Sequence, residues 1–336
     1  MISSSKLTVA LVISLNIFIL KTCLSFSPSP STPLKKTPSS SVKLTSLNMK
    51  TIDSHLHIWG TAADAKGSYP YASADQTPPP SLIDTSSASS LLTQMEENGV
   101  DGALIVQPIN YKYDHRYVAD AIAEHPDKLK GMLLIDPSLN EEESLKRLDE
   151  LILKGFVGVR YNPYLFEGDN KMRMSDNAAA KKVFHRCGEL KVPVGVMCFK
   201  GMELHYEDII ALCESSPETV VILDHFGFAA VDNQEQFQMV LDLAKYNVIV
   251  KISALFRLND EYPFDRVQKE RFDKLLEVYG AERLMFGTDF PFVMDQDFGY
   301  KGAVELVRSW TAGDETVTNA VMGGTAERLF GAWGGR

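Results

Sequence analysis

Two histidines stand two residues apart in the apolar segment TIDSHLHIWG, residues 51–60. If this segment is a β-strand, alternate side chains share a face, so His55 and His57 lie side by side. Such a pair can bind a divalent metal ion or polarise a carbonyl group. An H-x-H spacing also occurs in ordinary protein cores, so its setting in the chain decides between chemistry and packing.

Other reactive side chains follow later apolar segments of the same kind. Asp289 ends the segment RLMFGTDFP, and His225 follows VILD. A carboxylate can accept a proton from water or ligate a metal, and a histidine can hydrogen-bond a carbonyl oxygen or a hydrolytic water. The structural alternatives are a turn cap for Asp289 and a core histidine bonded to a backbone carbonyl for His225.

Two arginines lie just beyond further segments of this kind, Arg160 in GVRYNP and Arg257 in SALFRL. A guanidinium group matches a carboxylate with two parallel hydrogen bonds, so both are candidate contacts for an acidic substrate. Either could instead form an ion pair at the rim. Lys251, inside the preceding segment VIVKISA, could point inward or extend its stem outward between helices.

The elements that must position these side chains form a regular series. Eight apolar segments alternate with stretches such as EEESLKRLDELILKG, whose polar patterning is typical of helices. The predicted strands cover residues 51–59, 102–108, 131–137, 155–161, 192–199, 219–227, 248–254 and 283–291. This alternation favours a (β/α)8 barrel of the α/β class. A doubly wound sheet would carry a Gly-rich phosphate turn after its first strand, and the sequence has none.

In such barrels chemistry takes place at the carboxyl ends of the strands. The candidate residues, apart from Lys251, stand at or near those ends. Two longer connections, residues 60–90 and 161–176, also follow strands. We therefore expect them to wall a pocket at the same end of the barrel.

Composition limits the classes of partner. The chain has 336 residues, 45% hydrophobic and 23% charged, which is typical of a globular protein with a full core. Its formal net charge is −10, and all the acidic residues follow residue 52. Such an acidic body does not favour non-specific binding to nucleic acid or anionic membranes. Cys187, Cys198 and Cys213 have no C-x-x-C spacing, so reduced buried thiols are expected.

Residues 1–50 are predicted to be a disordered targeting leader, and residues 51–336 the barrel domain. The apolar run VALVISLNIFIL, after Lys6, is too short to span a bilayer and suits a signal peptide. The next stretch, from Phe26, is rich in Ser, Thr, Pro and Lys and resembles a transit peptide, as in the bipartite plastid presequences of algae with complex plastids. We expect a plastid location, with secretion as the alternative.

Six segments together resemble the amidohydrolase-related family, in the branch of 2-pyrone-4,6-dicarboxylate hydrolase and the sugar lactonases. They are IDSHLHIW, QPINYKYDHRY, GVRYNP, VILDHFG, KISALFR and LMFGTDFPF, and a weaker match, GGTAERLF, lies near the C-terminus. The resemblance implies a (β/α)8 barrel that hydrolyses a lactone, ester or amide-like bond.

The same resemblance implies roles for individual residues. His55, His57 and His225 would be catalytic, and Asp289 would accept the proton of the attacking water. Arg160 and Arg257 would contact substrate carboxylates.

The resemblance leaves open whether the enzyme binds a metal ion. His55, His57 and Asp289 could hold one divalent ion, zinc or manganese, but the lactonase branch includes members that work without metal. The fifth predicted strand ends in GVMCFKG, where metal-dependent relatives have a histidine. The fourth ends in Arg160, where binuclear members place a bridging lysine. A two-metal site is therefore not expected.

The predicted activity is hydrolysis of a small lactone, carboxylated or sugar-derived, by water that Asp289 activates. The alternatives are metal-dependent non-oxidative decarboxylation and a non-catalytic binding protein on a barrel scaffold. The predicted partner is an anionic small molecule, with no nucleic acid and, after leader removal, no membrane. Residue types leave the substrate's identity and the oligomeric state open.

Overall fold

The computed structural model describes residues 49–166 and 172–334. The leader predicted over residues 1–50 therefore lies, apart from its last two residues, outside the described part of the chain. Among the described residues, no helix has the length and apolar character needed to cross a membrane.

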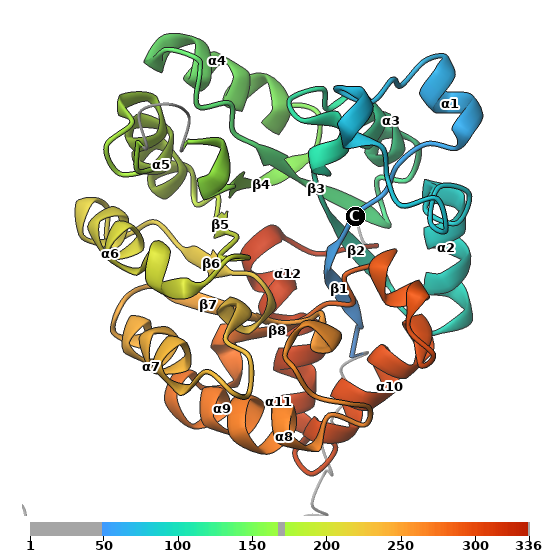
Figure 1. Cartoon of the computed structure of the whole chain (residues 1–336), viewed down its shortest axis with the longest axis vertical. Coiled ribbons are helices and arrows are strands. Elements are labelled where there is room, and N and C mark those ends of the chain that lie inside the picture. The colour runs from blue at the N-terminus through green and yellow to red at the C-terminus, as the bar shows by residue number, and fades with distance from the viewer. Residues whose placement is uncertain (1–48, 167–171, 335–336) are drawn as a thin grey trace, which may run out of the picture. The chain divides into compact units, whose positions relative to one another are not determined.

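Eight parallel strands of the described residues form one sheet in the order of the sequence, and they curve into a barrel (Figure 1). They are β1 (Ile52–Leu56), β2 (Gly102–Val106), β3 (Leu129–Leu134), β4 (Phe156–Tyr161), β5 (Val194–Val196), β6 (Val221–Leu223), β7 (Val248–Ile252) and β8 (Leu284–Phe286). Every predicted segment overlaps one strand, although β3 begins two residues before its segment, so the predicted (β/α)8 barrel is confirmed. Most strands end earlier than predicted, because turns begin at the open end, such as the 3₁₀ turn His225–Phe228 after β6.

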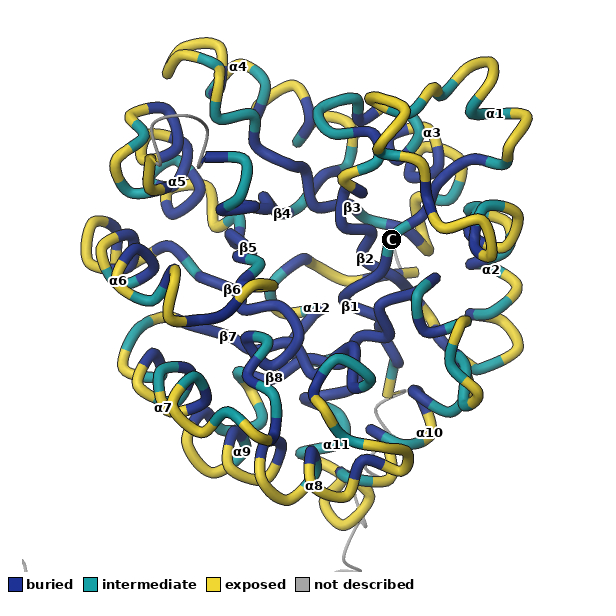
Figure 2. The backbone as a smooth tube through the Cα atoms, in the orientation of Figure 1, coloured by how far each residue is buried: buried dark blue, intermediate teal, exposed yellow. Residues whose placement is uncertain are grey.

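Most α-helices of the described residues surround the strands, whereas α12 lies in the middle of the ring of strands in the view of Figure 1. They are α1 (Ala62–Lys66), α2 (Ala88–Glu97), α3 (Arg116–Glu124), α4 (Glu141–Ile152), α5 (Ala178–Leu190), α6 (Tyr206–Ser215), α7 (Gln234–Asp242), α8 (Asp265–Val267), α9 (Asp273–Tyr279), α10 (Gly299–Thr311), α11 (Glu315–Asn319) and α12 (Thr325–Phe330). Figure 2 shows buried strands within helices whose outer faces are exposed. The main apolar core lies between these two layers.

Local sequence explains where individual helices begin. At α4, the Asn140 side chain accepts a hydrogen bond from the backbone N–H of Glu143, and Glu143 reaches back to the Asn140 backbone. Three acidic residues in the first turn also complement the positive end of the helix dipole. These caps fix the start of the helix that follows the end of β3.

The barrel closes between β8 and β1 through residues of the candidate site. The backbone N–H of Asp289 donates to the His55 carbonyl at 2.8 Å, and that of His57 donates to the Phe290 carbonyl at 2.7 Å. The buried carboxylate of Asp53 accepts the backbone N–H of Thr288 at 2.9 Å and its hydroxyl at 2.6 Å. Closure therefore joins the two chain segments that carry His55 and Asp289.

The interior of the barrel has an apolar layer and a polar layer. The apolar layer combines strand side chains with the C-terminal segment: Ile52, Leu104, Val106, Met132, Ile222, Ile249, Met285, Ala326, Phe330 and Trp333. On β7, Ile249 belongs to this layer, and Lys251 then lies beside His55. Ser253, two residues further on, contacts His225. Because alternate residues of a strand share a face, Ile249, Lys251 and Ser253 all point inward, and the polar members lie toward the carboxyl end.

Gly287, directly after β8, packs closely against His55 and Ser253, and a substitution can test how tight this packing is. A Cβ at this position would lie 2.9 Å from both the Cβ and the backbone nitrogen of His55 and 3.2 Å from the Ser253 Cβ. These neighbours cannot rotate away, so Gly287→Ala is expected to lower the free energy of unfolding by about 1–3 kcal/mol. Urea unfolding followed by circular dichroism measures the loss.

The matched control is Gly313→Ala, because a Cβ at Gly313 meets no atom within 4 Å. Its unfolding free energy should change by less than about 0.5 kcal/mol. Equal unfolding midpoints for the two variants would contradict the tight packing at Gly287.

Candidate active site

Three imidazole rings converge on one carboxylate oxygen at the open end of the barrel. The Oδ1 atom of Asp289 lies 3.7 Å from the Nε2 of His57, 3.7 Å from the Nε2 of His225 and 3.9 Å from the Nε2 of His55. Asp289, His55 and His225 are almost fully buried. The structure thus brings together the four side chains that the sequence suggested as catalytic.

The outer nitrogen of each ring has its own partner. His57 Nδ1 lies 2.8 Å from the carbonyl oxygen of Val106. A carbonyl only accepts, so Nδ1 of His57 carries the hydrogen and its Nε2 presents a lone pair to the site. His225 Nδ1 lies 2.8 Å from the Ser253 hydroxyl, which can donate to it and leave a hydrogen on Nε2.

The third ring, His55, contacts a buried charge network. Its Nδ1 lies 3.0 Å from Asp224 Oδ1 and 3.1 Å from the Nζ of Lys251. The Nη2 of Arg160 lies 2.8 Å from Asp224 Oδ2, an ion pair whose orientation is not that of a hydrogen bond. Asp224 therefore balances two buried cations beneath the site, since Lys251 Nζ is also within 3.3 Å of its Oδ1.

Burial controls the charge states of these groups. It lowers the pKa of His57 to about 3, with the Arg160 charge adding to the effect. Burial likewise holds the pKa of His55, beside Lys251, and that of His225 well below the usual range. All three imidazoles are consequently neutral at neutral pH.

The carboxylates respond differently to burial. Burial raises the pKa of Asp289 to about 6, although the nearby Arg257 charge opposes the shift. Burial alone would also raise the pKa of Asp224, but Arg160, His55 and Lys251 together hold it well below its usual range. Burial lowers the pKa of Lys251 to about 8 against the opposing effect of Asp224. Near neutral pH, Asp289 is thus the carboxylate in the site that can accept a proton.

Arg257 holds Asp289 from the side opposite the histidines. Its Nε and Nη2 lie 3.0 and 2.9 Å from Asp289 Oδ2, a two-pronged contact that leaves Oδ1 to face the rings. The guanidinium group also lies over the Phe292 ring, 5.1 Å from its centre. Arg257 is about one-third exposed, so its remaining N–H groups face the pocket.

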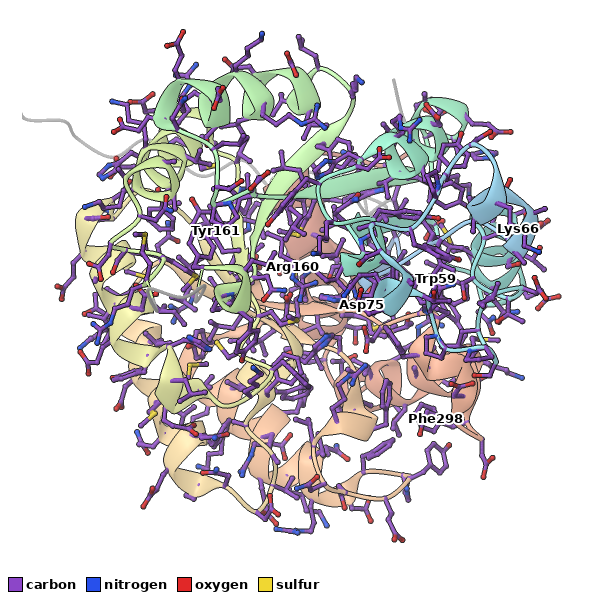
Figure 3. All side chains as sticks on the ribbon, turned by 45° about the horizontal axis from the view of Figure 1, so that its top comes forward. Trp59, Lys66, Asp75, Arg160, Tyr161 and Phe298 are labelled. Atoms are coloured by element: carbon purple, nitrogen blue, oxygen red, sulfur yellow. The ribbon has the colours of Figure 1, made fainter. Side chains whose placement is uncertain are left out.

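A cavity of about 440 Å³ opens above these groups. Charged and polar groups lie at its base, including Asp289, Arg160 and Arg257, and its walls are largely aromatic: Trp59, Tyr164, Phe199, Phe228 and Phe292. Figure 3 shows Arg160 near the middle of the barrel, while its neighbour Tyr161 lies toward the surrounding helices. There the Tyr161 hydroxyl donates to the Ala180 carbonyl of α5 at 2.6 Å.

One of the two predicted walls is found at this cavity. Asn162 and Tyr164, from the connection after β4, line it, although residues 167–171 of that connection lie outside the described part of the chain. Residues 60–90 were also predicted to wall the pocket, and this prediction is wrong. None of them belongs to the lining that the described residues form, and residues 107–110 after β2 line the cavity instead. Tyr69 and Tyr71 pack against an apolar cluster of Trp59, Leu82 and Tyr111.

The donor set can accept a divalent metal ion. Ligand atoms of His55, His225 and Asp289 lie within 4.8 Å of one another. The buried Nε2 of His55 has no hydrogen-bond partner among the described residues, so a cation or a polar substrate atom would satisfy it. Solvent would complete the coordination. This set contains His225 where the sequence suggested His57, whose Nε2 faces the same carboxylate oxygen.

Three buried residues of this network were not assigned roles from the sequence. Asp53 was not singled out, Asp224 was recognised only as the strand-end neighbour of His225, and the direction of Lys251 was undecided. Their positions follow from closure of the barrel, which brings Lys251 against His55. A signal for Lys251 was its spacing of two from Ser253, which lies on the same face of β7. Of the remaining candidates, Cys198 is buried, and burial raises the pKa of its thiol.

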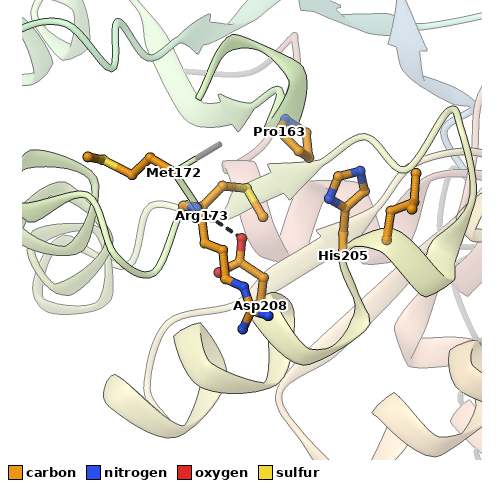
Figure 4. A pocket seen from close by; sticks show the side chains of 7 residues that line it. Pro163, Met172, Arg173, His205 and Asp208 are labelled. Carbon is orange, nitrogen blue, oxygen red and sulfur yellow. Dashed lines mark hydrogen bonds between the residues drawn. The ribbon is translucent and has the colours of Figure 1, made fainter. Parts of the chain in front are cut away.

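A second pocket, of about 330 Å³, lies beside the connection after β4 (Figure 4). Its described lining is Pro163, Met172, Arg173, Met174, Leu204, His205 and Asp208. Asp208 accepts the backbone N–H groups of Met174 and Ser175, each at 2.9 Å. None of the predicted site residues belongs to this described lining, so the aromatic-walled cavity is the candidate active site.

Comparison with known proteins defines the class. The amidohydrolase family model matches residues 52–332, which is most of the chain. The chain therefore belongs to the amidohydrolase family and is a hydrolase.

Solved structures agree with this assignment. A protein described as a 2-pyrone-4,6-dicarboxylic acid hydrolase from Pseudomonas putida is 25% identical, with 85% of this chain and 98% of that chain covered and a TM-score of 0.67. A protein so described from Acinetobacter baumannii, with citric acid bound, is 19% identical, with 84% and 100% covered and a TM-score of 0.68. An amidohydrolase from Burkholderia multivorans with bound zinc is 20% identical, with 84% and 99% covered and a TM-score of 0.66. These similarities establish the shared barrel fold.

Proposed function

We propose that the enzyme hydrolyses a small lactone whose flat ring carries a carboxylate. The observation that carries the proposal is the approach of three neutral imidazoles to Asp289 Oδ1 beneath an aromatic cavity with two arginines. The similarity to proteins described as pyrone dicarboxylic acid hydrolases supports the same substrate class.

In the proposed reaction a water molecule adds to the lactone carbonyl carbon and gives a proton to Asp289 Oδ1. The lone pair on His57 Nε2 accepts a hydrogen bond from the other O–H of that water and orients it, and this second hydrogen stays on the oxygen. A hydrogen on His225 Nε2 stabilises the oxyanion, with the Ser253 hydroxyl donating to Nδ1. Collapse breaks the ring C–O bond, and Asp289 returns the proton to the leaving oxygen.

Two features of the cavity would select the substrate. Arg160 and Arg257 offer guanidinium groups for a carboxylate. Trp59 and Phe292, whose ring centres are 6.0 Å apart, offer apolar surface to a flat ring. A divalent ion such as zinc or manganese would need lone pairs on Nε2 of both His55 and His225, with His225 Nδ1 then donating to the Ser253 hydroxyl. If His55, His225 and Asp289 held it in that state, it would supply Lewis-acid polarisation in place of the His225 hydrogen.

The test is proton release by the full chain on a panel of pyrone and muconolactone carboxylates and sugar lactones. Hydrolysis of carboxylated rings, with little on neutral sugar lactones, is the expected result. Release of carbon dioxide would establish the rival decarboxylase activity. No turnover of any lactone in the panel would contradict the proposal.

The pH dependence follows from the charge state of Asp289. Only the carboxylate form accepts a proton, and its pKa is about 6, so kcat/KM is expected to rise as the pH increases through about 6 and then level off. The charged or titratable groups facing Asp289 are His55, His57, His225, Arg160, Arg257 and Asp224. Since the imidazoles have low pKa values, they stay neutral in this range.

The measurement is a kcat/KM profile from pH 5 to pH 8 at constant ionic strength. Unfolding measured over the same range is the control, because burial also raises the pKa of Asp53 to about 6. A flat profile, or one that falls as the pH rises through 6, would remove Asp289 from the role of base.

A further inference from the structure

Lys251 forms a tight triangle with two other buried groups. Its Nζ lies 3.1 Å from His55 Nδ1 and 3.3 Å from Asp224 Oδ1, and those two atoms are 3.0 Å apart. Lys251 and His55 have no exposed surface. Among the described residues, the Lys251 ammonium also lies 3.8 Å from the sulfur of Met132, a weak acceptor.

Nδ1 of His55 can form a hydrogen bond with only one of its two neighbours, Lys251 or Asp224. An ammonium group donates hydrogen bonds and accepts none, whereas a carboxylate accepts and donates none. If Lys251 donates to Nδ1, the hydrogen of neutral His55 must be on Nε2. If Nδ1 donates to Asp224, Nε2 instead presents a lone pair to the site.

These two tautomers give the site different properties. Nε2 of His55 is the buried atom without a partner that faces Asp289 Oδ1 at 3.9 Å. With a hydrogen, it can donate to a substrate oxygen but cannot ligate a metal. With a lone pair, held by a carboxylate at Nδ1, it has the arrangement typical of metal-binding histidines.

The surrounding charges favour the first tautomer. Asp224 keeps two ion pairs without a hydrogen bond from His55, because Lys251 lies 3.3 Å and Arg160 2.8 Å from its oxygens. The Lys251 ammonium, in contrast, has few other acceptors within the apolar lower barrel. A divalent cation bound at Nε2 of His55 would also be repelled by the Lys251 ammonium, which lies beside Nδ1 of the same ring.

We propose that Lys251 is a positioning residue that holds His55 in the Nε2–H tautomer and thereby keeps the affinity of this site for divalent metal low. Donation of the His55 Nε2 hydrogen to a substrate oxygen would occur during the proposed hydrolysis, so that use of it rests on the proposed function. The tautomer and the metal affinity can be measured without any substrate, so their failure is separate from a failure of that function.

The first test reads the tautomer in the unaltered full chain. Histidine is labelled with ¹⁵N, and long-range ¹H–¹⁵N correlation at pH 7 distinguishes the nitrogen that carries hydrogen. Signals that disappear in His55→Asn identify the ring. A hydrogen on Nε2 is expected, and a hydrogen on Nδ1 would overturn the proposal without the need for a lysine variant.

The second test compares zinc affinity in Lys251→Met and the unaltered chain by competition with a chromophoric chelator. The variant is expected to bind Zn²⁺ at least tenfold more tightly and to move the His55 hydrogen to Nδ1. The matched control is Lys245→Met, because Lys245 is exposed and contacts the ring of Tyr246. Equal zinc affinity in Lys251→Met and the unaltered chain would overturn the proposal.

Discussion

Replacing Asp289 by asparagine is expected to lower kcat by roughly 10²- to 10⁴-fold, the usual contribution of a positioned general base. The asparagine has the same shape, and its oxygen can still accept hydrogen bonds from Arg257, which lies 2.9–3.0 Å from Oδ2. It cannot accept the proton of water. KM should change much less than kcat, because the arginines that face the cavity remain.

The measurement is steady-state hydrolysis of whichever lactone the unaltered enzyme cleaves, with thermal unfolding of both proteins. Stability should stay within about 1 kcal/mol, because the substitution removes a buried carboxylate whose ionisation burial already disfavours. Asp297→Asn is the matched control, since Asp297 is exposed and lies only eight residues further along the chain. A decrease in kcat below threefold would show that Asp289 is not the base.

The largest effect on stability is expected from Asp224→Leu. This change leaves the buried charges of Lys251 and Arg160 without their counter-charge, and the expected loss is about 3–5 kcal/mol in the free energy of unfolding. Asp224→Asn should cost less, because the amide still accepts hydrogen bonds. Urea unfolding and the thermal midpoint measure both variants.

A double-mutant cycle separates the charge effect from packing. If Asp224 acts mainly by balancing cations, Asp224→Asn combined with Lys251→Met should lose less stability than the sum of the two single variants. Asp149→Leu on the exposed side of α4 is the control for introducing leucine and should change little. Additive losses in the cycle would assign Asp224 a packing role instead.

Barrel closure explains the limits of sequence-based prediction at this site. His57 and Asp289 could be chosen from the sequence because each stands at the end of an apolar segment, where barrel enzymes carry their chemistry. The partners that fix them could not be chosen. Val106 contributes a backbone carbonyl, and Ser253 contributes one of the chain's many hydroxyl groups.

The arginines show the same limit. Their positions, at the end of β4 for Arg160 and after β7 for Arg257, were evident, and both line the cavity. Their ion pairs were not evident, because Arg160 contacts Asp224 and Arg257 contacts Asp289 only through the packing of different strands and the turns that follow them. Whether a charged side chain faces substrate, a counter-ion or both depends on distances between strands, and a pattern along one strand contains no such distances.

The sequence by itself determined the strand-and-helix alternation, the barrel and the end of the barrel where reactive residues gather, because apolar periodicity is a local property. Only the tertiary structure decided that Lys251 points inward against His55, that Asp53 joins β1 to the segment after β8, and which imidazole nitrogens face Asp289. The reason is that strand register and closure bring residues distant along the chain to within hydrogen-bonding distance. Burial then sets their charges.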